Sequence, residues 1–307
     1  IKEKIKPVFA CPYQYSFDIA KFDRHITKYH LNLEVLFMSL TGWPDWAIHL
    51  YKEMGFTWSG TSRDRTLRFK SLGCRGTGMP STSACNNLLS TALVLTVVRL
   101  SANKQGIKLT NEDLWRMPIL VIGDDWVIGS HFEIDPSLCE TLGFALTKGK
   151  ANRHCVEFCN AFYAFDGTDV HYFRDPDDFL PRWAIARGVA PTNVDLAASW
   201  LEQVLIAYSY VINECPIFWA LLHGQYRNLL KNQFKRYEHD WNTLPGYHLR
   251  TIIQAHGGNM KFQTCAPPKL ATRELFSRTF PEWNIARQLA AEREFLSTTT
   301  WLDEVRL

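Results

Sequence analysis

Two adjacent aspartates at the tip of an apolar hairpin constrain this chain more than any other feature. Two short apolar runs, residues 118 to 122 and 126 to 128, are separated only by Gly123, Asp124 and Asp125, a spacing that predicts a tight antiparallel hairpin. Neighbouring carboxylates repel each other unless a cation lies between them. A metal site therefore accounts for the pair, and a solvated turn is the alternative.

The remaining sequence predicts a folded protein with both helices and strands. Hydrophobic residues make up 46% and charged residues 21% of the 307 residues, which excludes a disordered or low-complexity chain. Two-residue alternation predicts a strand within residues 8 to 22 that ends near Asp18, and a strand pair within residues 56 to 72. Two helical pieces are expected within residues 31 to 54, and a long helix from Pro80. Beyond residue 180 the period is mostly helical, so we place a domain boundary there.

Two further polar patterns precede the acidic hairpin. Asp18 and Asp23, five residues apart, are common as a pair and mean little alone. Gly78 is followed by Thr82 and Asn86 at four-residue steps, which places the hydroxyl and the amide on one face of the predicted helix. Either residue alone could be a helix cap or a buried polar side chain whose hydrogen bonds are satisfied within the core. Their position between two acidic elements favours a shared site.

The ordered set resembles motifs A, B and C of viral RNA-dependent RNA polymerases. The matching segments are residues 17–23 (FDIAKFD), residues 78–87 (GMPSTSACNN) and residues 122–125 (IGDD). Residues 157–160 (EFCN) and 172–176 (YFRDP) are similar to the motif E region of tombusvirus-like enzymes. The resemblance covers about residues 15–176, and one departure is Thr77 before Gly78 where Ser is more usual.

The resemblance implies an α+β fold: a right-hand polymerase palm over residues 1–180, with an antiparallel sheet backed by helices, and a mostly helical thumb over residues 181–307. It implies template-directed RNA synthesis by two-metal nucleotidyl transfer from ribonucleoside triphosphates to an RNA 3′ end. Asp18 and Asp124 would hold two Mg²⁺ or Mn²⁺ ions, with Asp125 supporting them.

The same resemblance assigns substrate contacts to Asp23, Gly78, Thr82 and Asn86. The ribose 2′-OH is the group that separates a ribonucleotide from a deoxyribonucleotide. We expect Asp23 to accept a hydrogen bond from Asn86, which holds the Asn86 amide where the ribose binds. Sugar choice is then expected to depend on Asn86 and Asp23 more than on Thr82.

The general acid for the pyrophosphate leaving group is less well defined by the sequence. Lys148, Lys150 and His154 all lie between the acidic hairpin and the motif E run, and each could donate a proton. We favour Lys150 as the general acid, and the alternative is that Lys150 is a solvated surface lysine with no catalytic role.

Two other functions remain open. A reverse transcriptase would share the two-metal chemistry, but it typically carries an aromatic-x-Asp-Asp hairpin where this chain has Ile122 and Gly123 before the aspartates. A non-catalytic, palm-like scaffold could bind RNA or replication proteins, although the intact Asp18, Asp124 and Asp125 argue against it.

No motif in the sequence specifies the cellular compartment or the partners, so these expectations rest on charge, cysteine usage and the family resemblance. The net charge of +3 neither requires nor excludes nucleic acid, and the eight scattered cysteines suit a reducing compartment. We expect no transmembrane segment, RNA and possible viral replication proteins as partners, and a membrane-associated replication complex in the host cytoplasm. Because residue 1 is Ile, we also expect a fingers segment upstream and little activity from these residues alone.

Overall fold

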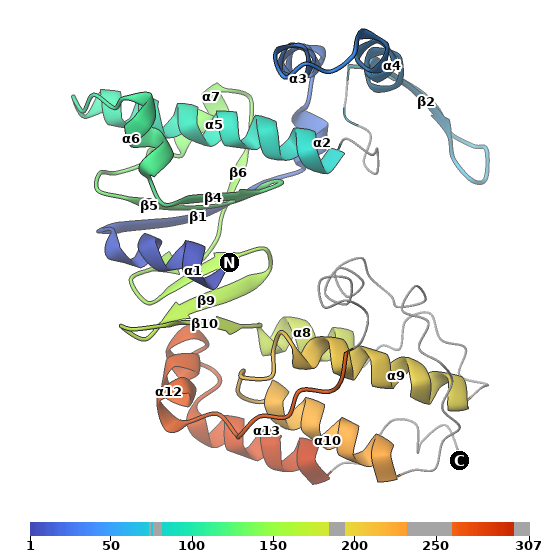
Figure 1. Cartoon of the computed structure of the whole chain (residues 1–307), viewed down its shortest axis with the longest axis vertical. Coiled ribbons are helices and arrows are strands. Elements are labelled where there is room, and N and C mark those ends of the chain that lie inside the picture. Colours follow the sequence, from blue (N-terminus) through green and yellow to red (C-terminus); the bar gives the residue numbers. More distant parts are fainter. Residues whose placement is uncertain (74, 76–81, 184–193, 232–259, 298–307) are drawn as a thin grey trace. The chain divides into compact units, whose positions relative to one another are not determined.

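The computed structural model describes residues 1–73, 75, 82–183, 194–231 and 260–297. The chain forms two compact units, one made of Ile1 and residues 3–159 and the other of Lys2 and residues 160–307. Figure 1 shows helices and antiparallel strands in the first unit and mostly helices in the second. The α+β prediction is confirmed. The unit boundary follows Cys159, whereas the predicted division into palm and thumb near residue 180 stays a prediction.

The first unit is built on a four-stranded antiparallel sheet of strand order β4-β5-β1-β6. The strands are β1 (Tyr13–Ile19), β4 (Ile119–Ile122), β5 (Asp125–Ser130) and β6 (Leu146–Lys148). The β4–β5 hairpin has Gly123 and Asp124 in its turn, as the sequence predicts, and Gly123 has a φ of 62° that suits glycine. Residues 8 to 10 differ from the expectation: they belong to the 3-10 helix η1 (Lys6–Ala10), because Pro7 favours a helical first turn.

Helix α5 (Thr82–Lys104) covers one face of this sheet (Figure 1). Its apolar residues join Phe17, Ile19, Trp126 and Ile128 in the main hydrophobic core, and the short helices α6 (Asn111–Arg116) and α7 (Ser137–Thr141) add Leu114, Leu138 and Cys139. The other face contacts η1 and the hairpin of β7 (Ala151–Asn152) and β8 (Cys155–Phe158). Strand alternation therefore sends odd-numbered β1 residues toward α5 and even-numbered ones toward β8.

Among the described residues, α5 is also the one helix with the length and composition to cross a membrane. Core helices of globular proteins meet the same two criteria, so this is weak evidence for a membrane span. Leu93, Val94, Val97 and Val98 of α5 are buried in the core cluster. We therefore interpret α5 as a core helix.

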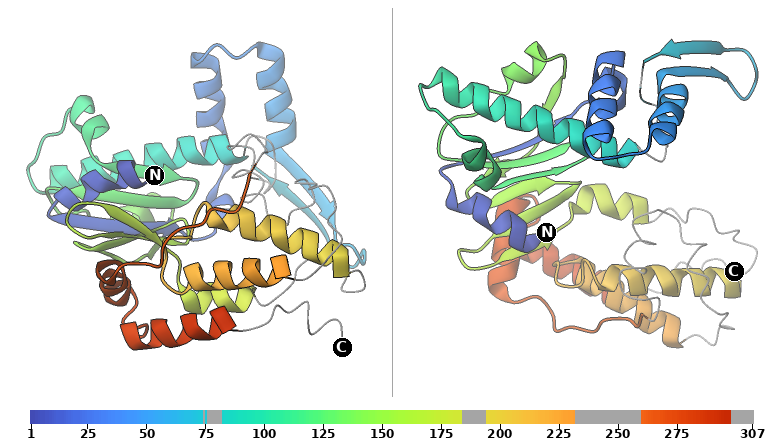
Figure 2. Two further views of the ribbon diagram at one scale, coloured as in Figure 1. Left: turned by 60° about the horizontal axis from the view of Figure 1, so that its bottom comes forward. Right: turned by 45° about the horizontal axis from the view of Figure 1, so that its top comes forward.

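The two predicted helical pieces are α3 (Lys28–Leu40) and α4 (Asp45–Phe56), which lie side by side in Figure 2. The short helix α2 (Phe22–His25) precedes them, and the strand pair β2 (Thr57–Thr61) and β3 (Arg68–Leu72) follows, as predicted. Glu34 of α3, Tyr51 of α4 and Arg75 form a buried network in which Arg75 donates to both partners. This network joins the two helices to the segment that precedes α5.

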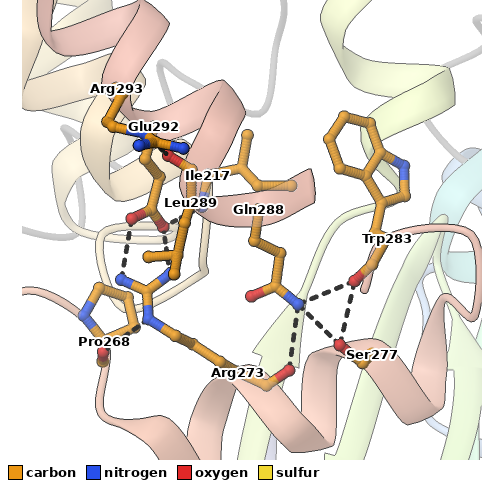
Figure 3. A network of polar contacts seen from close by, with 9 residues as sticks. All are labelled: Ile217, Pro268, Arg273, Ser277, Trp283, Gln288, Leu289, Glu292 and Arg293. Atoms are coloured by element: carbon orange, nitrogen blue, oxygen red, sulfur yellow. Dashed lines mark hydrogen bonds and ion pairs between the residues drawn. The ribbon is translucent and has the colours of Figure 1, made fainter. Parts of the chain in front are cut away.

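The second unit combines one strand pair with helices. Strands β9 (Ala161–Phe165) and β10 (Val170–Phe173) form an antiparallel hairpin. The helices described after it are α8 (Pro176–Trp183), α9 (Val194–Ser209), α10 (Phe218–Lys231), α12 (Leu270–Thr279) and α13 (Ile285–Ser297). Figure 3 shows the polar contacts that join α12 to α13, where Arg273 and Glu292 form a buried, two-pronged ion pair. The described part of residues 194–307 is mostly helical, as the sequence predicts.

Candidate active site

The two strands at the centre of the first sheet bring Asp18 and Asp125 together. Asp18 of β1 is the register partner of Asp125, the first residue of β5, so both side chains leave the sheet on the same face. Asp124 lies in the adjoining turn, and its carbonyl oxygen accepts a hydrogen bond of 3.0 Å from the Ile19 amide. Asp18 and Asp125 therefore lie on neighbouring strands, whereas Asp124, which we expected to supply a metal ligand from a strand next to Asp18, lies in the turn between β4 and β5.

The site is electrostatically unfavourable for its own carboxylates. Burial, followed by the nearby charges of Asp124 and Glu157, raises the pKa of Asp18. Burial and the charges of Asp18 and Asp124 raise the pKa of Asp125 to about 6. Such a gathering of like charge is typical of functional sites, since structural carboxylates are normally paired with a cation.

Cys159 and Glu157 also adjoin these carboxylates, a placement that no pattern in the sequence predicted. The thiol and the backbone amide of Cys159 both donate to the Asp125 carboxylate, which opposes the rise in its pKa. Cys159 has a φ of 53° and Asn160 a φ of 56°, a left-handed pair that turns the chain sharply after β8. The only sequence signal was the motif E resemblance, which does not specify a contact with Asp125. These bonds fit a supporting role for Asp125.

The donor atoms suit a hard divalent cation. Asp18 and Asp124 offer carboxylate oxygens, which Mg²⁺ and Mn²⁺ prefer, and their mutual repulsion would be relieved by a cation. Within the part of the chain that the structure describes, no three or more His, Cys, Asp or Glu side chains are grouped tightly enough to hold an ion. Mg²⁺ usually takes one or two carboxylates and completes its shell with water and substrate phosphates.

Asp23 and Asn86 are in direct contact, as expected. Lys21, with a left-handed φ of 53°, turns the chain from β1 into α2, where Asp23 lies. The Asn86 Nδ2 atom donates to Asp23 Oδ1 over 2.8 Å. Asn86 is only 9% exposed, and its Oδ1 atom is buried without a hydrogen-bond partner among the described residues. A buried acceptor without a partner is costly, so this atom is well suited to receive a ligand hydroxyl.

Thr82 begins α5 and lies one turn before Asn86, so the two residues share a face of the helix. The structure therefore places Thr82 beside the Asn86–Asp23 pair along α5. Gly78 and Thr77 lie outside the described residues.

The three candidates for the general acid are separated by the strand register. Lys148 pairs with Phe17 on β1, which directs it to the face opposite Asp18. Lys150 is linked through its backbone to Glu157: its amide donates to Glu157 Oε2 over 3.0 Å, and its carbonyl accepts from the Glu157 amide over 2.7 Å. His154 is exposed in the β7–β8 turn, where its amide donates to Asn152. The register thus disfavours Lys148, and the role of Lys150 stays a prediction.

Comparison with known proteins supplies an independent assignment. A family model described as viral RNA dependent RNA polymerase matches residues 1–301. A search of curated proteins finds no matching sequence. The family match extends over nearly the whole chain and includes the acidic hairpin, β1 and α5. The chain therefore belongs to the viral RNA-dependent RNA polymerase family, whose reaction is RNA synthesis on an RNA template.

Proposed function

We propose that this chain carries out two-metal nucleotidyl transfer from ribonucleoside triphosphates to an RNA 3′ end during viral genome replication. The observation that carries the proposal is the direct pairing of Asp18 with Asp125 beside Asp124, where burial and like charges raise the pKa values of Asp18 and Asp125. Asp18 and Asp124 would hold the two Mg²⁺ or Mn²⁺ ions, and Asp125, held by Cys159, would support them. When bound, such ions stabilise the attacking and leaving oxygens of an in-line displacement.

The ribose is read by Asn86 in this proposal. Asp23 fixes the orientation of the Asn86 amide by accepting its N–H group. The Asn86 Oδ1 atom is then available to accept a hydrogen bond from the ribose 2′-OH, and Thr82 lies one helical turn away. Lys150 is the proposed proton donor to pyrophosphate, and Gly78 is proposed to belong to the substrate-binding loop.

The wider organisation follows from the same assignment. Residues 1–180 would be the palm and residues 181–307 the thumb. The partners would be template and nascent RNA, ribonucleoside triphosphates and other viral replication proteins. We propose a membrane-associated replication complex in the host cytoplasm as the location.

Changing Asp124 to Asn in the complete polymerase polypeptide tests the proposal. Asn keeps the shape of Asp but loses the charge that a divalent ion requires. We expect Mg²⁺- and Mn²⁺-dependent nucleotide incorporation to fall at least a hundredfold, about 2.7 kcal/mol in the barrier, with unchanged thermal unfolding. Asp45→Asn is the matched control, because Asp45 is an exposed residue in the first turn of α4.

The same assay separates the alternatives. Incorporation by Asp124→Asn within tenfold of wild type would show that the acidic hairpin does not hold the metal. Preference of the wild-type enzyme for deoxyribonucleotides would indicate a reverse transcriptase. RNA binding without any incorporation by the wild-type enzyme would indicate a scaffold.

A further inference from the structure

Asn87, the neighbour of Asn86 on α5, contacts the turn that carries Asp124. Its Oδ1 atom accepts a hydrogen bond of 2.6 Å from the Gly123 amide. The two residues are 36 positions apart in the chain, so this contact is purely tertiary. The site described above does not use Asn87.

The bond satisfies a donor that the hairpin itself leaves open. Ile122 and Asp125 form the last register pair of β4 and β5, so the Gly123 amide lies in the turn beyond the strand ladder. On the other side of the turn, the Asp124 carbonyl accepts from the Ile19 amide over 3.0 Å. The backbone around Asp124 is therefore held on one side by α5 and on the other by β1.

A second bond ties the same hairpin to the same helix. The indole Nε1 of Trp126 donates to the Ser90 hydroxyl, and both residues are buried. Ser90 lies three positions after Asn87, so the two residues face the same side of α5. Because the Trp126 indole already anchors β5 in the core, loss of the Asn87 bond should change only the conformation of the turn and leave β5 in place.

We propose that Asn87 is a positioning residue that fixes the backbone of Asp124 for metal binding. This inference rests on the proposed function and adds a residue to it. Through Asn86 and Asn87, adjacent positions of one helix hold both the ribose-reading pair and the metal-binding turn. A movement of α5 would then displace both together.

The test compares Asn87→Leu, which has a similar shape but no acceptor, with Asn87→Asp, which keeps an acceptor oxygen. Asn103→Leu is the matched control, since Asn103 is an exposed residue near the end of the same helix. The hydrogen bond is measured by NMR on protein labelled with carbonyl-¹³C isoleucine and ¹⁵N glycine. This labelling selects the two Ile–Gly peptides of the chain, those of Gly123 and Gly129. Gly129 is an internal reference, because its amide donates to Pro118.

We expect the Gly123 amide signal to move upfield in Asn87→Leu and to stay close to its wild-type position in Asn87→Asp, while Gly129 is unaffected. In the complete polymerase, Asn87→Leu is expected to lower kcat at least tenfold, to change the nucleotide KM less than threefold, and to raise the Mg²⁺ concentration for half-maximal rate. Asn103→Leu should change none of these values.

An unmoved Gly123 signal in Asn87→Leu would overturn the proposal by showing that the bond is absent. A moved signal with unchanged kcat and Mg²⁺ dependence would overturn it by showing a purely structural contact. A wild-type enzyme that incorporates no nucleotide would overturn the proposed function and the positioning role together. A defect in Asn87→Leu that disappears in Asn87→Asp would support the role of the acceptor oxygen.

Discussion

Charged groups are arranged in opposite ways in two regions of this protein, the acidic strand ends of the first unit and the contact between α12 and α13 in the second. Where β1 ends and β5 begins, the like charges of Asp18, Asp124 and Asp125 gather, and burial together with these charges raises the pKa values of Asp18 and Asp125. Between α12 and α13, Arg273 donates to both carboxylate oxygens of Glu292 over 2.6 and 2.8 Å. Glu292 Oε1 also accepts from the amide of Ile217, the residue that precedes α10 (Figure 3).

The difference separates a site from a structural contact. The acidic strand ends disfavour the folded protein until a cation compensates them, so folding alone does not account for their presence. Arg273 and Glu292 compensate each other's charge, and their hydrogen bonds join α12, α13 and the residue that precedes α10. The comparison predicts that loss of charge affects activity at the acidic strand ends and stability at the contact between α12 and α13.

The largest expected effect on stability follows from Arg273→Met. This change leaves the Glu292 carboxylate buried without its cation, which typically costs about 3 to 5 kcal/mol. Urea unfolding measures the loss. Arg116→Met is the matched control, because the Arg116–Glu112 pair is exposed and such helical pairs contribute about 0.3 to 0.5 kcal/mol.

Asp18→Asn removes a charge from the acidic strand ends, and its stability is measured in the same urea unfolding experiment. Removing one of several repelling carboxylates should leave the stability of the metal-free protein unchanged or slightly raised. A loss of stability in Asp18→Asn equal to that in Arg273→Met would contradict the distinction between the two regions.

The next effect in size concerns sugar choice. Asn86→Ala removes both the bond to Asp23 and the buried Oδ1 atom that is proposed to accept from the 2′-OH. A hydrogen bond of this kind contributes about 1 to 3 kcal/mol, so the preference for ribonucleotides should fall roughly tenfold to a hundredfold. The measurement is the ratio of kcat/KM for a ribonucleotide and its deoxy analogue in the complete polymerase, with Asn103→Ala as control. An unchanged ratio would make Asn86 a structural residue of α5.

Local pattern predicted several helices and strands, and the family resemblance supplied most of the candidate site residues. Alternation identified β1, and the glycine before two aspartates identified the β4–β5 turn, because both signals lie within a few adjacent residues. The Asp23–Asn86 bond was expected only through the family resemblance, since 63 positions separate the two residues.

The contacts of Asn87 and Cys159 could not be predicted from the sequence. Whether an asparagine on a helix meets a turn amide depends on how the helix crosses the sheet, and no local pattern encodes that crossing. Cys159 reaches Asp125 because two consecutive left-handed residues turn the chain after β8, and neither Cys nor Asn signals that turn in the way glycine does.

The smallest expected effect is a pH dependence confined to the acidic region. The pKa of Asp125 is raised from the ordinary value of 3.8 to about 6, so between these values the folded protein holds a proton that the unfolded chain has released. Stability must then fall as the pH rises through this window, and Asp18 contributes in the same direction. Allowing for solvent at this partly exposed group, the decline in the free energy of unfolding due to Asp125 is on the order of 1 kcal/mol.

Urea unfolding in EDTA from pH 4 to 7 should show a steeper decline in wild type than in Asp125→Asn. Asp135 and Asp166, whose pKa values are lowered to about 2, titrate below this window and leave the comparison unaffected. Equal slopes for the two proteins would mean that the acidic strand ends are not destabilising, and the contrast with Arg273–Glu292 would fail.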